Sequence, residues 1–190
     1  MNKRKVLYLI ATLMFIACRG SQTQDTEKGV TSYQQELINK GWLMNSPQEG
    51  DMPEEYGITA TTGILDNYFD IELGGELDMA VKIIDVESDQ AIRYVYVPAG
   101  STTTVNELPT GIYYLKITYG KDWMYTNENG KVIGKFTKET SYEQSTTTFD
   151  FGAKNTLEAK YYSLKIHIKH DPRYESFSTV EISEQEFLDE

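Results

Sequence analysis

The chain has 190 residues, of which 25% are charged and 39% hydrophobic, a composition that suits one globular domain and not a multi-span membrane protein or a disordered chain. Lys and Arg number 18 against 29 Asp and Glu, and the resulting net charge of −11 argues against nucleic acid as a partner, because phosphate backbones are also negative. The sequence contains no Gly-x-Ser-x-Gly elbow and no Gly-rich phosphate loop. It therefore predicts a protein that is not an enzyme and that uses no cofactor.

The first 17 residues have the pattern of a secretory signal. Lys3, Arg4 and Lys5 supply positive charge, and residues 6–17 form a mostly apolar stretch. This stretch is too short for a permanent transmembrane helix, which needs about 20 apolar residues. We therefore expect residues 1–17 to be a cleaved signal peptide.

The segment Phe15-Ile16-Ala17-Cys18 resembles the lipobox of bacterial lipoproteins, in which an aliphatic residue and two small residues precede a Cys. The resemblance implies that Cys18 is acylated and that the protein is anchored in the bacterial cell envelope, at the outer membrane. Cys18 is also the only cysteine of the chain, so it has no internal disulfide partner. The alternative is an ordinary apolar thiol inside an uncleaved leader.

Residues 19–30 are polar and small, without apolar periodicity, and we interpret residues 18–30 as the lipidated Cys and a flexible tether. Ser32 followed by Gln35 has the spacing of an N-cap and its N3 partner, which predicts a helix of about two turns before Gly41. Tyr33, Leu37 and Trp42 would form its apolar side. Pro and acidic residues dominate 45–55, so residues 31–56 are expected to hold one short helix and an acidic loop.

Residues 57–190 are expected to form a β-sandwich domain, because apolar and polar residues alternate along most of this region. The pattern predicts about eight short strands in an all-β, antiparallel sandwich of the prealbumin or immunoglobulin-like kind, with one wet face per sheet. A parallel sheet is not expected, since crossover helices are missing. The alternation is clear at 68–73, 79–86, 91–97, 102–107, 112–119 and 162–169, and weaker at 131–137, 146–151 and 178–183.

One corner motif has a recognisable shape. In Leu108-Pro109-Thr110-Gly111, the proline fixes a turn, the glycine permits positive φ, and Tyr113 and Leu115 then point inward. The motif resembles the Leu-Pro-x-Gly-x-Tyr-x-Leu corner of transthyretin-like and collagen-adhesin B-type domains, including carboxypeptidase regulatory-like domains. That resemblance implies a small sandwich used as an adhesive or spacer module. The order of short motifs over residues 113–151 also resembles an uncharacterised bacterial domain family, which implies a fold and no activity.

Other chemistry has weak support in the sequence. An internal Lys–Asn amide, as in some adhesin domains, would use Glu107 as the assisting acid, but the position of Lys82 relative to Asp85 does not match that pattern. His167 and His170 lie three apart on a predicted strand, where side chains diverge, so no metal site is expected. Weak calcium binding stays open at a group of acidic residues, which are Asp66, Asp70, Glu72, Glu76 and Asp78.

Tyr119, Trp123 and Tyr125 are the candidate ligand-binding residues, because they bracket a loop expected at 120–125. Aromatic side chains on loops at the end of a sandwich commonly stack on sugars or contact proteins. The alternative is that Trp123 folds back and plugs the end of the core.

The predicted function is that of a non-catalytic, membrane-anchored lipoprotein of the cell envelope, acting as a protein-binding or structural and adhesive module. The alternative is a carbohydrate-binding surface lipoprotein that uses the three aromatic residues. The expected partners are the membrane, through acyl chains on Cys18, and an envelope protein or glycan. Exposed, coplanar rings of Trp123 and Tyr125 would favour the carbohydrate hypothesis.

Overall fold

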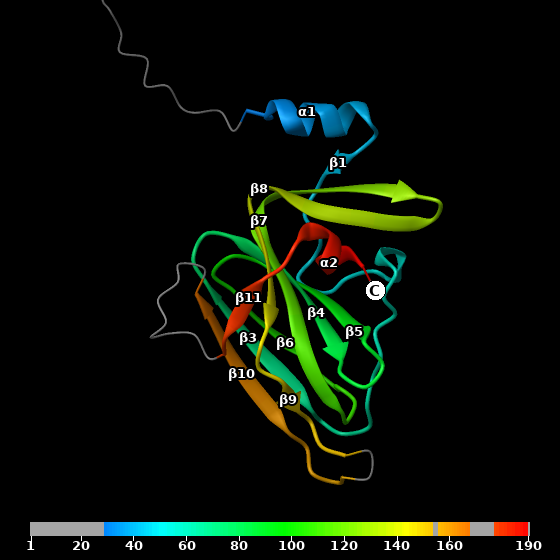
Figure 1. The fold of residues 1–190 in the computed structure, drawn as a ribbon, viewed down its shortest axis with the longest axis vertical. Coiled ribbons are helices and arrows are strands. Elements are labelled where there is room, and N and C mark those ends of the chain that lie inside the picture. Colours follow the sequence, from blue (N-terminus) through cyan, green and yellow to red (C-terminus); the bar gives the residue numbers. More distant parts are fainter. Residues whose placement is uncertain (1–28, 154–155, 168–176, 190) are drawn as a thin grey trace, which may run out of the picture. The chain divides into compact units, whose positions relative to one another are not determined.

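The computed structural model describes residues 29–153, 156–167 and 177–189, with the side chain of His167 left out. The chain divides into two units, Met1–Val30 and Thr31–Glu190. The signal peptide, Cys18, most of the tether and His170 lie outside the described residues. All the helices and strands given below belong to the second unit (Figure 1).

The second unit consists mostly of two β-sheets, which confirms the predicted sandwich-like, mostly β architecture. The larger sheet has the order β11-β8-β7-β4-β5-β2, with β1 and β9 also paired to β7, and the smaller sheet has the order β10-β3-β6. The larger sheet contains β1 (Leu43–Met44), β2 (Gly50–Asp51), β4 (Asp78–Asp85), β5 (Gln90–Val97), β7 (Ile112–Glu128), β8 (Lys131–Ser145), β9 (Phe149–Asp150) and β11 (Thr179–Glu181). The smaller sheet contains β3 (Tyr68–Gly74), β6 (Thr102–Val105) and β10 (Tyr161–His167).

The main core lies between the facing sides of the two sheets. The alternation read from the sequence is correct here, since the inward positions of β7 before residue 120 and of β3 are buried. Rings from both sheets meet edge to face, with the centroids of Phe69 and Phe149 5.1 Å apart. This core includes Phe69, Ile71, Leu73, Met79, Val81, Ile83, Val95, Val97, Tyr113, Leu115, Ile117, Tyr119, Phe149, Phe151, Leu164 and Ile166.

Part of the outer face of the larger sheet is also buried, so the expectation of one wet face per sheet is wrong for this sheet. The segment that carries Met52 and Ile58 covers part of that face, and Phe187 of helix α2 (Glu184–Leu188) covers another part. These residues pack on Ala80, Tyr94, Tyr96, Trp123 and Phe136 of the sheet. As a result, six consecutive residues of β4 are buried, on both faces of the strand.

The pairing of β10 with β3 is parallel, which corrects the expectation of a wholly antiparallel fold. Parallel neighbours need a long connection between them, and a helix usually supplies it. Here β4 to β9, of which all but β6 belong to the larger sheet, lie between β3 and β10 in sequence. The connection is therefore made of strands, and no crossover helix is required.

Strands β7 and β8 are longer than predicted and form one bent hairpin (Figure 1). Their register shifts between Tyr119 and Lys121, and Asp122 and Glu139 adopt positive φ of 54° and 51°. Such an irregularity bends a ladder without ending it. The stretch 120–125, expected as a loop, therefore continues as strand.

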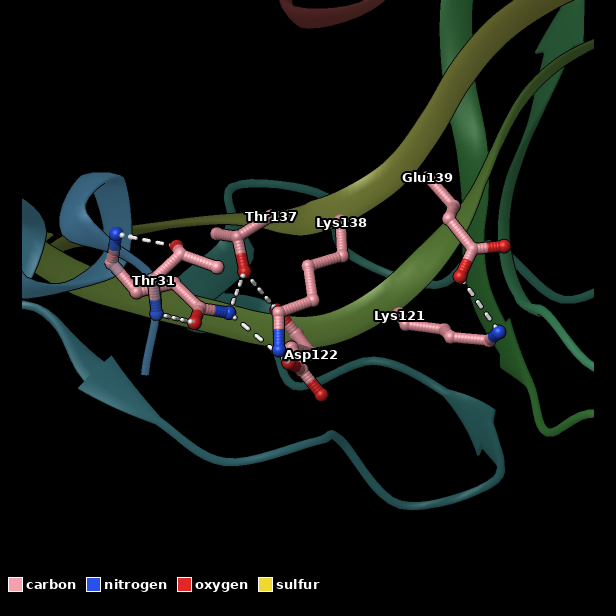
Figure 2. A network of polar contacts seen from close by, with 7 residues as sticks. Thr31, Lys121, Asp122, Thr137, Lys138 and Glu139 are labelled. Atoms are coloured by element: carbon pink, nitrogen blue, oxygen red, sulfur yellow. Dashed lines mark hydrogen bonds and ion pairs between the residues drawn. The ribbon is translucent and has the colours of Figure 1, made fainter. Parts of the chain in front are cut away.

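Helix α1 (Ser32–Asn39) lies at the bend of this hairpin, as Figure 2 shows. Its N-cap is Thr31 with Gln34 at N3, one residue earlier than the predicted Ser32 and Gln35. Leu37 is buried as expected, but Tyr33 is exposed. Gln34 is fully buried, because its side chain binds the hairpin as well as the cap.

The corner at Leu108 forms as predicted, although its glycine has a different role. Leu108 is buried, and the hydroxyl of Tyr113 donates to the carbonyl of Pro109 at 3.0 Å. Gly111 does not adopt positive φ. A Cβ at Gly111 would lie 2.7 Å from the Tyr113 hydroxyl, so the glycine is needed for the close approach of that ring.

Candidate functional site

The three predicted binding residues do not form one exposed aromatic surface. Tyr119 is 4% exposed and belongs to the core between the sheets, whereas Trp123 is 1% exposed and belongs to the cluster on the outer face. Tyr119 and Trp123 have the same parity and would share a face in a regular strand. The strand is irregular between them, with a register shift after Tyr119 and a positive φ at Asp122, and the two side chains belong to different clusters. The expected platform is therefore not formed. Trp123 is buried, as the plug alternative required, but it packs on the outer face of the larger sheet rather than at the end of the core.

Trp123 holds the side chain of Tyr56, which was not among the predicted binding residues. Its indole Nε1 donates to the hydroxyl of Tyr56 at 3.3 Å, and the two ring centroids lie 6.3 Å apart. Tyr56 ends the short 3₁₀ helix η1 (Glu54–Tyr56) and also meets Tyr94 edge to face at 6.0 Å. Burial raises the pKa of the Tyr56 phenol, the bond from Trp123 lowers it, and the nearby phenol of Tyr125 raises it.

Tyr56 and Tyr125 line one pocket of about 500 Å³. Eight of its eleven lining residues lie between positions 45 and 56, which run from the end of β1 through η1, and the other three come from the β7–β8 hairpin. Residue Tyr125 is held in place by the pairing of β1 with β7, in which Leu43 is opposite Tyr125. The lining consists of Asn45, Ser46, Pro47, Gln48, Asp51, Pro53, Glu55, Tyr56, Tyr125, Asn127 and Val132.

The residues that line this pocket are mostly polar, and none of them is cationic. It offers two phenols, three side-chain amides, a hydroxyl and two carboxylates. Asp51, one of these carboxylates, lies 3.7 Å from the buried guanidinium of Arg93, which offsets part of its charge. The lining contains no His, Cys or Lys, and its phenols and amides are suited to ring stacking and hydrogen bonding.

A second pocket, of about 680 Å³, lies beside the Leu108 corner, and its lining includes Asp85, Glu87 and Asp150. The backbone N–H of Gly152 is the main cause that lowers the pKa of Asp150, with Lys160 adding to it. No group of three His, Cys, Asp or Glu side chains within the described ranges is placed to hold a metal ion. The acidic residues considered for calcium, Asp66 to Asp78, lie in that searched part of the chain.

The structure does not bring Lys82 and Glu107 together. The Lys82 ammonium donates to the carbonyl of Phe187 at 2.9 Å on the outer face of the larger sheet. It also lies over the rings of Tyr94 and Phe187. Glu107 is exposed and follows β6 of the smaller sheet, so the arrangement needed for an internal amide is not formed.

Comparisons of the chain with protein-family models, curated proteins and solved structures find no match. The resemblance to transthyretin-like domains therefore rests on the corner motif alone. In the part of the chain that the structure describes, no helix has the length and apolar character needed to cross a membrane.

The sequence contains only a weak indication of this pocket. Tyr56 is the only aromatic residue between Leu43 and Asn67, in a stretch rich in Pro and acidic residues. A lone aromatic residue in such a segment is a candidate for packing on an apolar surface or on a ligand. Its partner surface, Trp123, is 67 positions away, and local sequence patterns do not show such pairings.

Proposed function

We propose that this chain is a non-catalytic lipoprotein of the bacterial cell envelope, anchored in the outer membrane by acyl chains on Cys18. The leader supports this proposal through its short apolar stretch and the Ala17-Cys18 junction.

The function that we propose for the anchored unit is to bind a protein or to act as a structural module. The observation that supports it is the set of exposed apolar side chains on α1 and β1, of which Leu43 is the most exposed at 57%. These side chains are close together in the sequence, and exposed apolar side chains are candidates for protein contacts. The set consists of Tyr33, Ile38, Leu43 and Met44.

A photo-crosslinking amino acid at Leu43 tests this function in the native envelope. The matched control is the same amino acid at Ser163, which is exposed on β10 of the other sheet. We expect a discrete crosslinked product from position 43 and none from position 163. Equal products from both positions, or none from position 43, would contradict a protein-binding role for this surface.

A second candidate function, carbohydrate binding, is favoured by the position of Tyr125 in the 500 Å³ pocket. This site differs from the predicted one, because Trp123 and Tyr119 are buried and the second aromatic residue in the pocket is Tyr56. Neither function needs a catalytic step.

A further inference from the structure

We infer that the pocket between Tyr56 and Tyr125 binds a neutral oligosaccharide through ring stacking and amide hydrogen bonds. This inference rests on the proposed role as a binding module and names a ligand class for a site separate from the α1–β1 surface. It does not depend on the lipid anchor.

The aromatic part of the pocket is fixed before any ligand arrives. Tyr56 is held by the hydrogen bond from Trp123 and by the edge-to-face contact with Tyr94. Trp123 is itself fixed, since its ring meets Phe136 at 4.8 Å and Tyr96 at 6.0 Å. A rigid tyrosine loses little conformational entropy when a ligand packs on it, which favours binding of a weakly interacting partner such as a sugar ring.

The polar part of the lining matches the hydroxyl groups of sugars. Asn45, Gln48 and Asn127 each carry both a donor and an acceptor in one planar group, and a sugar hydroxyl also donates and accepts. The side chain of Asn127 is oriented by the turn, because its Oδ1 accepts from the backbone N–H of Gly130 at 3.0 Å. These amides come from both walls, so a ligand in the pocket would be held from two sides.

The charge of the lining favours a neutral ligand over an anionic one. Asp51 and Glu55 are its only charged residues, and the whole chain carries −11. An anionic glycan or a phosphate would meet these carboxylates without a cation in the lining to balance them. A cationic peptide is less suited, because Asp51 already faces Arg93. The volume of about 500 Å³ is within the usual range for small-ligand sites.

The experiment is titration calorimetry with the full-length mature protein in a detergent whose head group is not a sugar. The probes are maltohexaose, cellohexaose and chitohexaose, with oligogalacturonate as an anionic glycan and hexalysine as a cationic peptide. We expect at least one neutral oligosaccharide to bind and the two charged probes to give no heat of binding.

Variants assign the binding to the pocket. Tyr125→Ala should weaken binding of that oligosaccharide by about tenfold or more, as expected for an aromatic anchor. Tyr125→Phe, which keeps the ring, should retain most of the affinity. Tyr161→Phe and Tyr161→Ala serve as controls, because Tyr161 is exposed on β10 and does not line the pocket.

Three results would overturn the inference: no neutral oligosaccharide binds, a charged probe binds instead, or Tyr125→Ala binds as well as the unmodified chain. Because Tyr125 is half-buried, circular dichroism of each variant checks that the fold is kept. Failure of this experiment leaves the crosslinking result at Leu43 and the lipidation of Cys18 as separate tests of the proposed function.

Discussion

The side-chain amide of Gln34 donates to the carboxylate of Asp122 at 3.1 Å and to the hydroxyl of Thr137 at 2.8 Å (Figure 2). Its carbonyl oxygen meanwhile accepts from the backbone N–H of Thr31 at 2.8 Å, within the capping box of α1. One buried glutamine thus joins the start of the helix to the bend of the β7–β8 hairpin. Asp122 is fixed in turn by an ion pair with Lys138 at 2.6 Å.

Replacement of this glutamine should loosen α1 from the hairpin. We expect Gln34→Ala to lower the free energy of unfolding by about 1–3 kcal/mol, because it removes several hydrogen bonds in a buried position. The matched control is Gln35→Ala, whose exposed side chain bonds only to Asn39 among the contacts described. Urea unfolding measures the difference, and amide hydrogen exchange should show faster exchange in α1. Equal stability of the two variants would contradict this role for Gln34.

The ring of Trp123 should leave no room for a side chain at Gly134. A Cβ at Gly134 would lie 2.5 Å from Cζ2 of that ring, which is closer than real side chains approach. We expect Gly134→Ala to destabilise the fold by about 1–3 kcal/mol through overpacking.

A double-mutant cycle identifies the cause. In the background Trp123→Phe, whose smaller ring leaves room, the cost of Gly134→Ala should fall by at least about 0.5 kcal/mol. Thermal or urea unfolding of the four chains gives the coupling. An unchanged cost in the two backgrounds would show that the contact with Trp123 is not the reason for the glycine.

The buried tyrosines should make the fold sensitive to alkaline pH. Burial raises the pKa of Tyr113 to about 12, with the negative charge of Asp85 adding to this and Arg93 opposing it. The phenol of the unfolded chain ionises near its usual value of about 10, so the folded chain binds more protons between these values. The contribution of Tyr113 to stability is therefore complete below about pH 10 and is lost as the pH rises towards 12.

Urea unfolding at pH 8 and at about pH 11 measures this effect. Tyr113→Phe should be less stable than the unmodified chain at pH 8, since it loses the bond to Pro109, and should lose less stability between the two pH values. The control Tyr161→Phe changes an exposed tyrosine and should keep the full pH dependence. An identical loss in Tyr113→Phe and the unmodified chain would refute the assignment.

Local alternation predicted much of the fold, because a strand with one buried side shows that side in its sequence. The residues Tyr113, Leu115 and Ile117 illustrate this, since all three face the core as expected. The same rule failed beyond Tyr119, where the irregular pairing with β8 reverses the sides of the strand. Nothing in the residues around Asp122 indicates that reversal, because it depends on how β7 pairs with β8.

Short elements that cover a sheet were harder to predict. Helix α2 has a capping box of Ser183 and Glu186, a spacing visible in the sequence, but the nearby strand pattern extended the predicted strand to 183. Phe187 of this helix is buried because it packs against Tyr94 and Tyr142, two residues of the larger sheet. The pocket was missed for the same reason, since Tyr56 obtains its position from Trp123 and not from its neighbours in sequence.

Intact-mass measurement of the protein extracted from its native membrane, beside a Cys18→Ala variant, tests the central claim that the chain is a lipid-anchored module. We predict a chain that starts at Cys18 and carries added acyl mass in the membrane fraction, with both features lost in the variant. A soluble product without acyl mass, or a variant that fractionates with the membrane like the unmodified chain, would contradict the account.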